Sequence, residues 1–505
     1  MIRWAGLAFL LLWFSTAVFH LYKTLPAGID AATPFRAGED VALLVDATWI
    51  DAAGAQEARQ HTRQAIFDEM LRLIAQAQQL IVLDLFLYND FAGAVDAQHR
   101  PLSSELTEAL VRRARTVEGL TVVLITDPIN QVYGGLRSPG FTALRAAGVT
   151  VIETDLRPLR DSNPLWSGFW RLCCQWLGDD FDGGWLPNPL GAEDAPKVPL
   201  RSLLAMANFK ANHRKTLVVD SDDGWTGLVT SANPHDASSR HSNVAVRFSG
   251  PAALDLLATE HAVARMSGQS DAFAMPAAGR QSLRAAEGDE GAGGAGSVAS
   301  LVGASLEAGA APALRVLTES RIRDAALELI ETARPGDRLD LAMFYLAHRD
   351  IIRALVGAHQ RGALVRVLLD PNEAAFGLEK DGVPNRPVAT ELHAVGVEVR
   401  WANTRAEQFH TKLLLRTTRE GRIDLLAGSA NFTRRNLDNL NLETNVQLRG
   451  TATVDALRDA QGYFETRWHN ERERRHSTAY ESRADPSLLR YWRYRFMEAT
   501  GLSTF

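Results

Sequence analysis

Cysteine is almost absent from this sequence, which has two such residues in 505, the adjacent Cys173 and Cys174. So few cysteines exclude a disulfide framework and a spaced cysteine metal site. We interpret the pair as packing residues, with a strained vicinal disulfide as the alternative. The chain also lacks a strong excess of one charge, because its net charge is −6. Nucleic acid is therefore not expected as a partner, although a local basic cleft is not excluded.

The N-terminus departs from an otherwise ordinary globular composition, because residues 4–19 carry no charge. A helix through Tyr22 would be about 28 Å long, close to the ~30 Å hydrocarbon thickness of a bilayer. Residues 1–23 are therefore expected to be a signal anchor or a cleaved signal peptide. Aromatic residues typical of a membrane interface favour the anchor: Trp13, Phe14, Phe19 and Tyr22. We expect the body of the protein to be membrane-anchored on the extracytoplasmic (periplasmic) side.

Two stretches of the chain repeat one order of elements. Over residues 61–153, helical spacing of apolar residues alternates with short β-branched and aromatic runs. The same order returns over residues 320–401, and the Asp-Pro pair at Asp127 matches the pair at Asp370. Alternating helices and apolar strands predict an α/β fold. The repeat indicates an internal duplication.

The landmarks divide the chain into a first domain at 40–266 and a second at 313–475. Residues 267–312 between them are rich in Gly and Ala and are expected to be a flexible linker. Within the first domain, residues 159–207 are an insertion that holds four of the eleven tryptophans: Trp166, Trp170, Trp176 and Trp185. The favoured interpretation is a lid with a small core of its own, and the alternative is an apolar rim that touches lipid.

The C-terminal tail, residues 476–505, interleaves arginine with aromatic residues over 488–496. Such a segment suits an anionic lipid interface. A terminal helix that docks on the body explains the pattern equally well.

A His-x-Lys pair begins an apolar strand in each copy, at His213 and Lys215 and again at His410 and Lys412. Side chains two residues apart on a strand share a face, so each pair points the same way. Asp220, at an odd offset, falls on the other face. A Ser-Ala-Asn turn follows each pair at nearly equal spacing, with the polar residues Ser231, Asn233, Ser429 and Asn431.

Two histidines can divide a phosphoryl transfer between them. One attacks phosphorus to form a phosphohistidine, while the other protonates the leaving oxygen. Two lysines can neutralise the charge that develops on the non-bridging oxygens. This chemistry needs no metal and no cofactor.

These residues resemble the signature of the phospholipase D superfamily, which is His-x-Lys-x4-Asp followed by a Gly/Ser-Ser-x-Asn turn, in two copies. The resemblance covers about residues 40–470. It implies two similar α/β domains in a pseudo-twofold arrangement, with the active site at their interface and activity as a monomer. The site residues that it implies are His213, Lys215, Asn233, His410, Lys412 and Asn431, supported by Ser231 and Ser429.

The two copies also differ. Thr417 replaces the second aspartate of the signature. The signature places the remaining Asp220 among the catalytic candidates together with Glu443, although its face of the strand favours a structural role for Asp220. Alignment of the copies places Glu443 opposite His241. In the family an acidic residue after the turn can hold a catalytic histidine, and we expect Glu443 to hold His410. Family habit makes His213 the nucleophile, whereas this carboxylate favours His410, so the roles stay open.

Three functions fit these patterns. The first is an enzyme that cleaves a phospholipid at a membrane surface, or transfers its phosphatidyl group to water or an alcohol, as cardiolipin synthases do. The second is a nuclease of the same superfamily, which the acidic balance of the chain disfavours. The third is a non-catalytic, membrane-attached binding module. The residues do not decide between hydrolysis and transfer.

Overall fold

The computed structural model describes the chain with several gaps. The described residues are 2–51, 60–91, 99–177, 183–191, 195–221, 224–277, 279–280, 312–375, 378–379, 381–405, 407–503 and 505. Most of the expected linker, residues 281–311, lies outside them. Its first part does not behave as a free linker, because Phe273 and Met275 are buried in the hydrophobic core.

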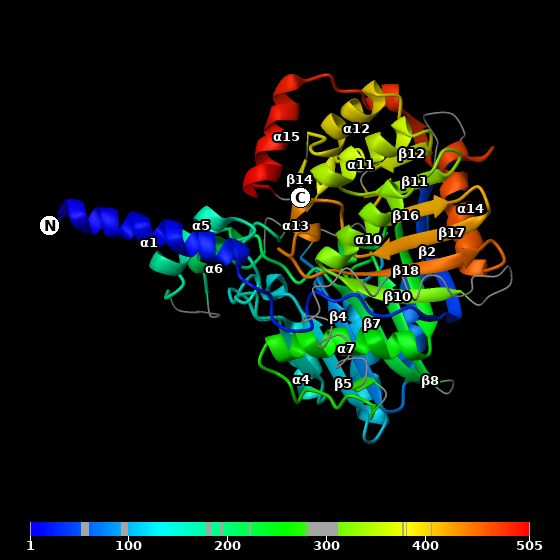
Figure 1. Ribbon diagram of the computed structural model, residues 1–505. Coiled ribbons are helices and arrows are strands. Elements are labelled where there is room, and N and C mark those ends of the chain that lie inside the picture. Colours follow the sequence, from blue (N-terminus) through cyan, green and yellow to red (C-terminus); the bar gives the residue numbers. More distant parts are fainter. Residues whose placement is uncertain are drawn as a thin grey trace.

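Two nine-stranded mixed sheets form the body (Figure 1). The first sheet runs in the order β19 (Arg474–Arg475), β2 (Glu39–Asp51), β9 (Asn243–Ser249), β8 (Gly224–Thr230), β7 (Lys215–Ser221), β4 (Leu80–Leu85), β5 (Thr121–Thr126) and β6 (Thr150–Glu153), with β3 (Gln60–Arg63) beside β2. The second runs in the order β1 (Arg36–Ala37), β10 (Ala313–Thr318), β18 (Thr444–Thr451), β17 (Arg422–Gly428), β16 (Lys412–Thr417), β11 (Arg338–Met343), β12 (Leu364–Leu369), β15 (Glu398–Ala402) and β20 (Ser477–Ala479). A separate hairpin joins β13 (Ala374–Ala375) and β14 (Leu378–Glu379).

The two sheets repeat the same strand order, as the duplication predicts. In each, a central strand pairs in parallel with one neighbour and antiparallel with the strand that begins at the lysine of the His-x-Lys pair. Even the register is kept, because Leu85 lies opposite Lys215 and Met343 lies opposite Lys412. The predicted α/β fold of two similar domains is confirmed.

Helices cover the outer faces of both sheets, and two further helices pack in the core that the inner faces share. The outer helices are α2 (Ile66–Gln76), α3 (Leu102–Thr116) and α4 (Pro139–Ala146) on the first sheet, and α10 (Ser320–Glu331), α11 (Arg349–Gln360) and α12 (Asn385–Ala394) on the second. The inner helices are α7 (Pro251–Met266) and α14 (Asp455–His469). Short turns complete the fold: η1 (Pro128–Gln131), η2 (Asp236–Ser238), α13 (Arg434–Leu437) and η4 (Tyr480–Arg483).

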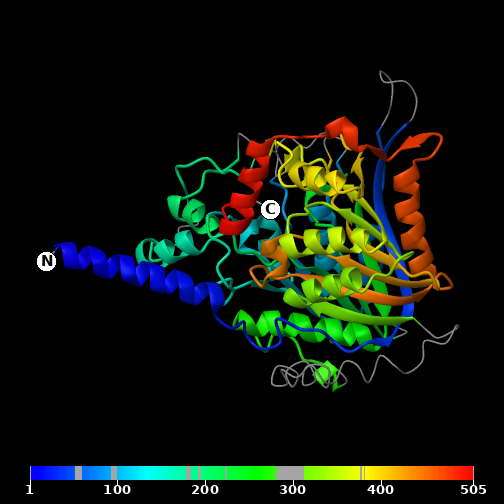
Figure 2. The ribbon, with the colours of Figure 1, turned by 45° about the horizontal axis from the view of Figure 1, so that its top comes forward.

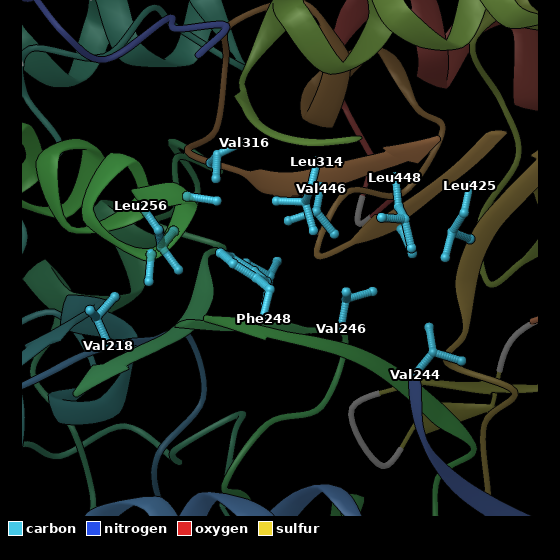
Figure 3. Close-up of a cluster of buried hydrophobic side chains, with 14 of the residues drawn as sticks. Val218, Val244, Val246, Phe248, Leu256, Leu314, Val316, Leu425, Val446 and Leu448 are labelled. Atoms are coloured by element: carbon cyan, nitrogen blue, oxygen red, sulfur yellow. The ribbon is translucent and has the colours of Figure 1, made fainter. Parts of the chain in front are cut away.

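One hydrophobic core joins the two halves. Figure 3 shows Val246 and Phe248 of β9 facing Leu314 of β10 and Val446 of β18. Edge strands also cross between halves, since β1 extends the second sheet and β19 extends the first. The two domains are therefore packed as one body rather than tethered loosely.

The N-terminal helix α1 (Ile2–Tyr22) projects from this body, as Figures 1 and 2 show. Residues Arg3–Tyr22 are long and apolar enough to cross a membrane, and 6% of that stretch is buried. The C-terminal half of α1, next to the body, packs on α5 (Pro164–Cys173) of the insertion. The second helix of the insertion is α6 (Leu200–Met206).

The insertion only partly matches the expected lid. Trp166 donates to the carbonyl of Leu204 over 3.0 Å and packs in the insertion, but Trp176 and Trp185 are 76% and 70% exposed. Cys173 and Cys174, interpreted from the sequence as packing residues, form a disulfide.

The C-terminal tail ends in α15 (Leu488–Thr500), which docks on the second half. The Tyr494 hydroxyl is buried there and donates to the carbonyl of Ala347 over 2.8 Å.

Candidate active site

The two His-x-Lys pairs lie at the start of β7 and β16, at the ends of the sheets where β4 and β11 finish. Each lysine turns back and donates to the carbonyl of its own histidine, over 2.6 Å for Lys215 and 2.9 Å for Lys412. Both lysines are fully buried. The cation of Lys215 is among the charges that lower the pKa of Lys412, so the two pairs share one site. The structure thus brings the four main predicted residues together.

An aromatic ring supports each pair, and the sequence reasoning missed both rings. Phe86 follows β4 and lies 4.6 Å from the ring of His213, while Phe344 follows β11 and lies 5.0 Å from the ring of His410 (centroid distances). Each phenyl face also lies against its lysine. Equivalent positions in the two copies would have revealed these residues.

Glu443 holds His213 and not His410, which corrects the pairing expected from the sequence. Its Oε1 atom lies 2.8 Å from Nδ1 of His213. The cause is backbone pairing between the two halves. Asn212 and Leu442 form an isolated parallel β-bridge, and the His213 amide donates to the Leu442 carbonyl over 2.9 Å. The segment before each histidine therefore meets the segment after the turn of the other copy.

The second histidine has the mirror arrangement with a different partner. Ser242 bridges Phe409, and this contact places Asn243 Oδ1 3.0 Å from Nδ1 of His410. The Asn243 amide donates to the His241 carbonyl, so its oxygen is free to accept from the imidazole. Both histidines thereby present Nε2 as the unprotonated nitrogen when neutral. The sequence offered Asn243 only as an alignment landmark.

The two serines orient these partners. Ser231 donates to Asn243 Oδ1 over 3.0 Å, and Ser429 donates to the carboxylate of Glu443. Both hydroxyls also accept a backbone N–H and are completely buried. We therefore assign them a positioning role in place of the phosphate contact expected from the sequence.

The two asparagines of the turns remain at the site as candidate phosphate contacts. Asn233 and Asn431 are 5% and 6% exposed. Asn233 Oδ1 accepts weakly from the Leu87 amide over 3.4 Å. Asn431 Oδ1 is buried and has no hydrogen-bond partner among the described side chains and backbone. An unpaired buried amide is costly unless a ligand completes it.

Asp220 does not reach the site, although it was placed among the catalytic candidates. Its carboxylate accepts the backbone N–H groups of Gln78, Gln79 and Leu80 at the start of β4. This structural role agrees with its odd offset on the strand. At the matching position Thr417 accepts from the Gln461 side chain over 3.0 Å.

The aspartates of the two Asp-Pro pairs hold the strands that carry the histidines. Asp127 accepts the amide of Asn212 and Asp370 accepts the amide of Phe409, each over 2.7 Å. Burial raises the pKa of both carboxyls to about 7. The sequence reasoning used them only to align the copies.

A completely buried ionic network lies behind the first His-x-Lys pair. Arg214, between His213 and Lys215, is completely buried and forms an ion pair with Glu319 over 3.0 Å. Glu319 Oε1 also accepts the amide of Glu443 over 3.0 Å. Burial raises the pKa of Glu319 to about 7, against the opposing effect of Arg214. In the second half the residue between the pair is Thr411, which contacts the hydroxyl of Tyr463.

Burial also sets the charge state of the site. It lowers the pKa of His213 to about 4, although Glu443 acts in the opposite direction, and it lowers the pKa of Lys215 to about 7. Burial also lowers the pKa of His410 and of Lys412, and the neighbouring cations act on both groups in the same direction. A bound anion would relieve this repulsion, so the site favours an anionic ligand.

The structure offers no obvious metal centre in the part of the chain that it describes, since no three His, Cys, Asp or Glu side chains gather there as metal ligands do.

The chain is similar to known proteins in part of its sequence and in its fold. Residues 326–468 match the family described as "Cardiolipin synthase, PLD-like domain". The phosphatidylserine synthase of Haemophilus influenzae Rd KW20 has the same fold, with a TM-score of 0.54 and 11% identity over 93% of this chain and 96% of that chain. No curated protein sequence matches this chain.

Two further solved structures align less well. They are a polyphosphate kinase from Porphyromonas gingivalis (TM-score 0.45, 12% identity, 92% of this chain and 53% of that chain) and the phospholipase D family member Nuc from Salmonella typhimurium (TM-score 0.26, 20% identity, 32% and 99%). Residues 326–468 thus match a PLD-like domain by sequence, and nearly the whole chain shares its fold with a phosphatidylserine synthase.

Proposed function

We propose that this protein is a membrane-attached enzyme that transfers the phosphatidyl group of a phospholipid to water or an alcohol through a phosphohistidine. The observation that carries the proposal is the crossed arrangement of the site, which gives its two histidines different partners beside two buried lysines. The match to a cardiolipin synthase domain supports a phospholipid substrate. The apolar helix α1 supports attachment to a membrane, with the body on the extracytoplasmic side.

His213 is the nucleophile in this proposal. Its Nε2 lone pair attacks phosphorus, a P–N bond forms, and the P–O bond to the leaving alcohol breaks. The phosphorylated ring is positively charged, and the carboxylate of Glu443 at Nδ1 stabilises that charge. Lys215 and Lys412 stabilise the negative charge on the non-bridging oxygens.

His410 is the general acid and then the general base. Its neutral partner Asn243 orients the ring without stabilising the imidazolium, so the proton passes readily to the leaving oxygen. In the second step His410 removes a proton from water or an alcohol, whose oxygen forms a new P–O bond as the P–N bond breaks. This step releases the product and restores His213.

The test is headgroup release from phospholipid vesicles by the full-length protein, with and without added glycerol or phosphatidylglycerol, and with products identified by mass spectrometry. Turnover is expected in the wild type and is expected to be lost in His213→Ala and His410→Ala. Glycerol-dependent products would indicate transfer, and phosphatidic acid would indicate hydrolysis. Turnover that persists in either variant, or cleavage of single-stranded DNA without lipid turnover, would contradict the proposal.

A further inference from the structure

Large apolar side chains are exposed mainly at one end of the molecule. Apart from α1, the described residues of this kind belong to the insertion and to the C-terminal segment: Leu165, Trp176, Leu177, Trp185, Leu200, Leu488, Leu489, Trp492, Phe496 and Leu502. Within the described part of the two α/β halves, the others are Leu364 and Val395, at 44% and 42% exposure. Leu364 is the first residue of β12, at the end of the strands that is opposite the histidines. A concentration of this kind marks an interaction surface.

Helix α15 presents an apolar face to solvent. Leu488, Leu489, Trp492 and Phe496 are 74%, 80%, 64% and 60% exposed. At 100° per residue these four positions fall within one side of the helix. The opposite side docks on the body through Tyr494 and through Glu498, whose carboxylate accepts the Arg434 amide over 2.8 Å. The apolar face is therefore not required for docking on the protein.

The charges of α15 suit an anionic surface. Its three arginines, Arg490, Arg493 and Arg495, outnumber its single acid, Glu498, which is buried, and two of them also pair with acids outside the helix, Asp485 and Asp381. On the helical wheel Arg493 and Arg495 flank the apolar face on its two sides. An apolar face between cationic flanks is the pattern of helices that lie in a membrane interface.

The surface is continuous with the candidate anchor. At Gly501, directly after α15, a Cβ atom would lie 1.8 Å from the carbonyl oxygen of Ser162, which precedes α5. Helix α5 in turn lies against α1, because the Trp13 indole donates to the Leu165 carbonyl over 2.7 Å. In Figures 1 and 2, α1 leaves the body at the end that carries α15, and α15 runs across the direction of α1. If α1 crosses a bilayer, α15 lies along its surface.

The same end leads to the catalytic histidines. Arg435 donates to the carbonyls of Gly501 and Ser503, which follow α15. The ring of Phe505 lies 6.1 Å from Tyr345, which lies 4.0 Å from Phe344, the ring that packs on His410. A membrane seated on α15 is therefore adjacent to the site.

We propose that α15, with Trp176 and Trp185 of the insertion, is a lipid-docking face that lies in the interface of an anionic bilayer and seats the catalytic site on the membrane. This inference rests on the proposed function in taking the phospholipid bilayer as the location of the substrate. Its occupant is the bilayer surface rather than a second copy of the chain.

The first test is depth-dependent quenching of tryptophan fluorescence in the full-length protein, on phosphatidylglycerol vesicles that contain brominated lipid. The difference in fluorescence quenching between the wild type and Trp492→Phe gives the signal of Trp492 alone. The substitution keeps an aromatic side chain at this position. Quenching of the Trp492 signal is expected, and it is expected to be weaker on phosphatidylcholine vesicles. An unquenched Trp492 would overturn the proposal, and this readout does not depend on any enzyme activity.

The second test compares activity on vesicles with activity on a soluble nitrophenyl phosphodiester. Burial of the two aromatic side chains in the bilayer strengthens docking, so Trp492→Glu/Phe496→Glu is expected to lower the ratio of lipid to soluble activity about tenfold or more. Leu364→Glu and Val395→Glu are the matched controls and should leave the ratio unchanged. An unchanged ratio in the double variant, or a change in oligomeric state on light scattering, would overturn the docking face. If the wild type turned over neither substrate, the proposed function would be refuted, and the fluorescence test of the docking face would still stand.

Discussion

In the first half of the candidate site a carboxylate, Glu443, holds His213, whereas in the second half an amide, Asn243, holds His410. The backbone around the two histidines is otherwise the same, with equivalent strands, lysines, aromatic rings and supporting serines. A carboxylate stabilises a positive ring and an amide does not. The comparison teaches that a duplicated scaffold can give its two histidines different surroundings by changing one side chain behind each, and in the proposed function this difference divides nucleophile and acid between the copies.

The difference extends into the core. Arg214 of the first half is locked by Glu319, which also accepts the amide of Glu443, and Thr411 of the second half has only hydroxyl and carbonyl contacts. The backbone amide of Glu443 is thus held by Glu319, and the buried ion pair of Glu319 with Arg214 joins the two halves. The following experiments break or sharpen this comparison.

The largest effect is expected from separating the roles of the histidines. His410→Ala should lower phospholipid turnover by about 10²–10⁴-fold, because the leaving alkoxide loses its proton donor. A nitrophenyl phosphodiester needs no such donor, so the variant should still release nitrophenolate in the first turnover, as measured by rapid-mixing absorbance. His213→Ala should release none. The reverse result would show that the roles are exchanged.

Removal of the buried Arg214 is expected to lower the free energy of unfolding more than the matching change at Thr411. Arg214→Met leaves Glu319 and Glu260 buried without their cation, at a cost of about 3–5 kcal/mol in the free energy of unfolding. Thr411→Val in the second half should cost about 1 kcal/mol. Urea unfolding of the two variants measures both. Equal losses would contradict the asymmetry of the core.

Exchange of the partners behind the histidines tests the comparison itself. Glu443→Gln should slow formation of the phosphoenzyme by about 10–100-fold, since the charge on the phosphorylated ring loses its carboxylate. Asn243→Asp should raise the pKa of His410 and have a smaller effect on this step. Rapid-quench measurement of the phosphoenzyme separates the two. A greater loss in Asn243→Asp would refute the assignment.

The mildest perturbation is pH. The nucleophile His213 must be unprotonated, whereas the general acid His410 and the cation Lys215 must be protonated. Burial lowers the pKa of all three groups, to about 4 for His213 and to about 7 for Lys215. Therefore kcat/KM should fall as acid protonates His213, and it should fall again as rising pH deprotonates first His410 and then Lys215. A bound phosphate anion favours the lysine cation, so kcat should fall less on the basic side. Steady-state rates across pH check this, and a basic limb that is equally steep in kcat would contradict it.

Local pattern was enough to predict a large part of this molecule. The alternation of helices and strands, the duplication and the shared face of His213 and Lys215 depend on residues near one another in sequence. Strand parity also separated Asp220 from the site correctly, because the face of a strand is a local property.

The partners of the histidines could not be predicted in this way. Glu443 reaches His213 because Asn212 and Leu442 pair across the interface, although 230 residues separate them. The bond between Arg214 and Glu319 likewise depends on how the sheets pack. Neither contact leaves a periodic signal, and only the family resemblance pointed to an acidic partner.

The central claim is that His213, held by Glu443, is the residue that becomes phosphorylated. The most direct measurement is to quench the full-length enzyme with alkali during turnover, when phosphohistidine is stable, and to locate the modified peptide by mass spectrometry. His410→Ala should increase the amount trapped when a nitrophenyl phosphodiester is used. The account predicts the modification on His213. A modification on His410, or turnover without any modified histidine, would contradict it.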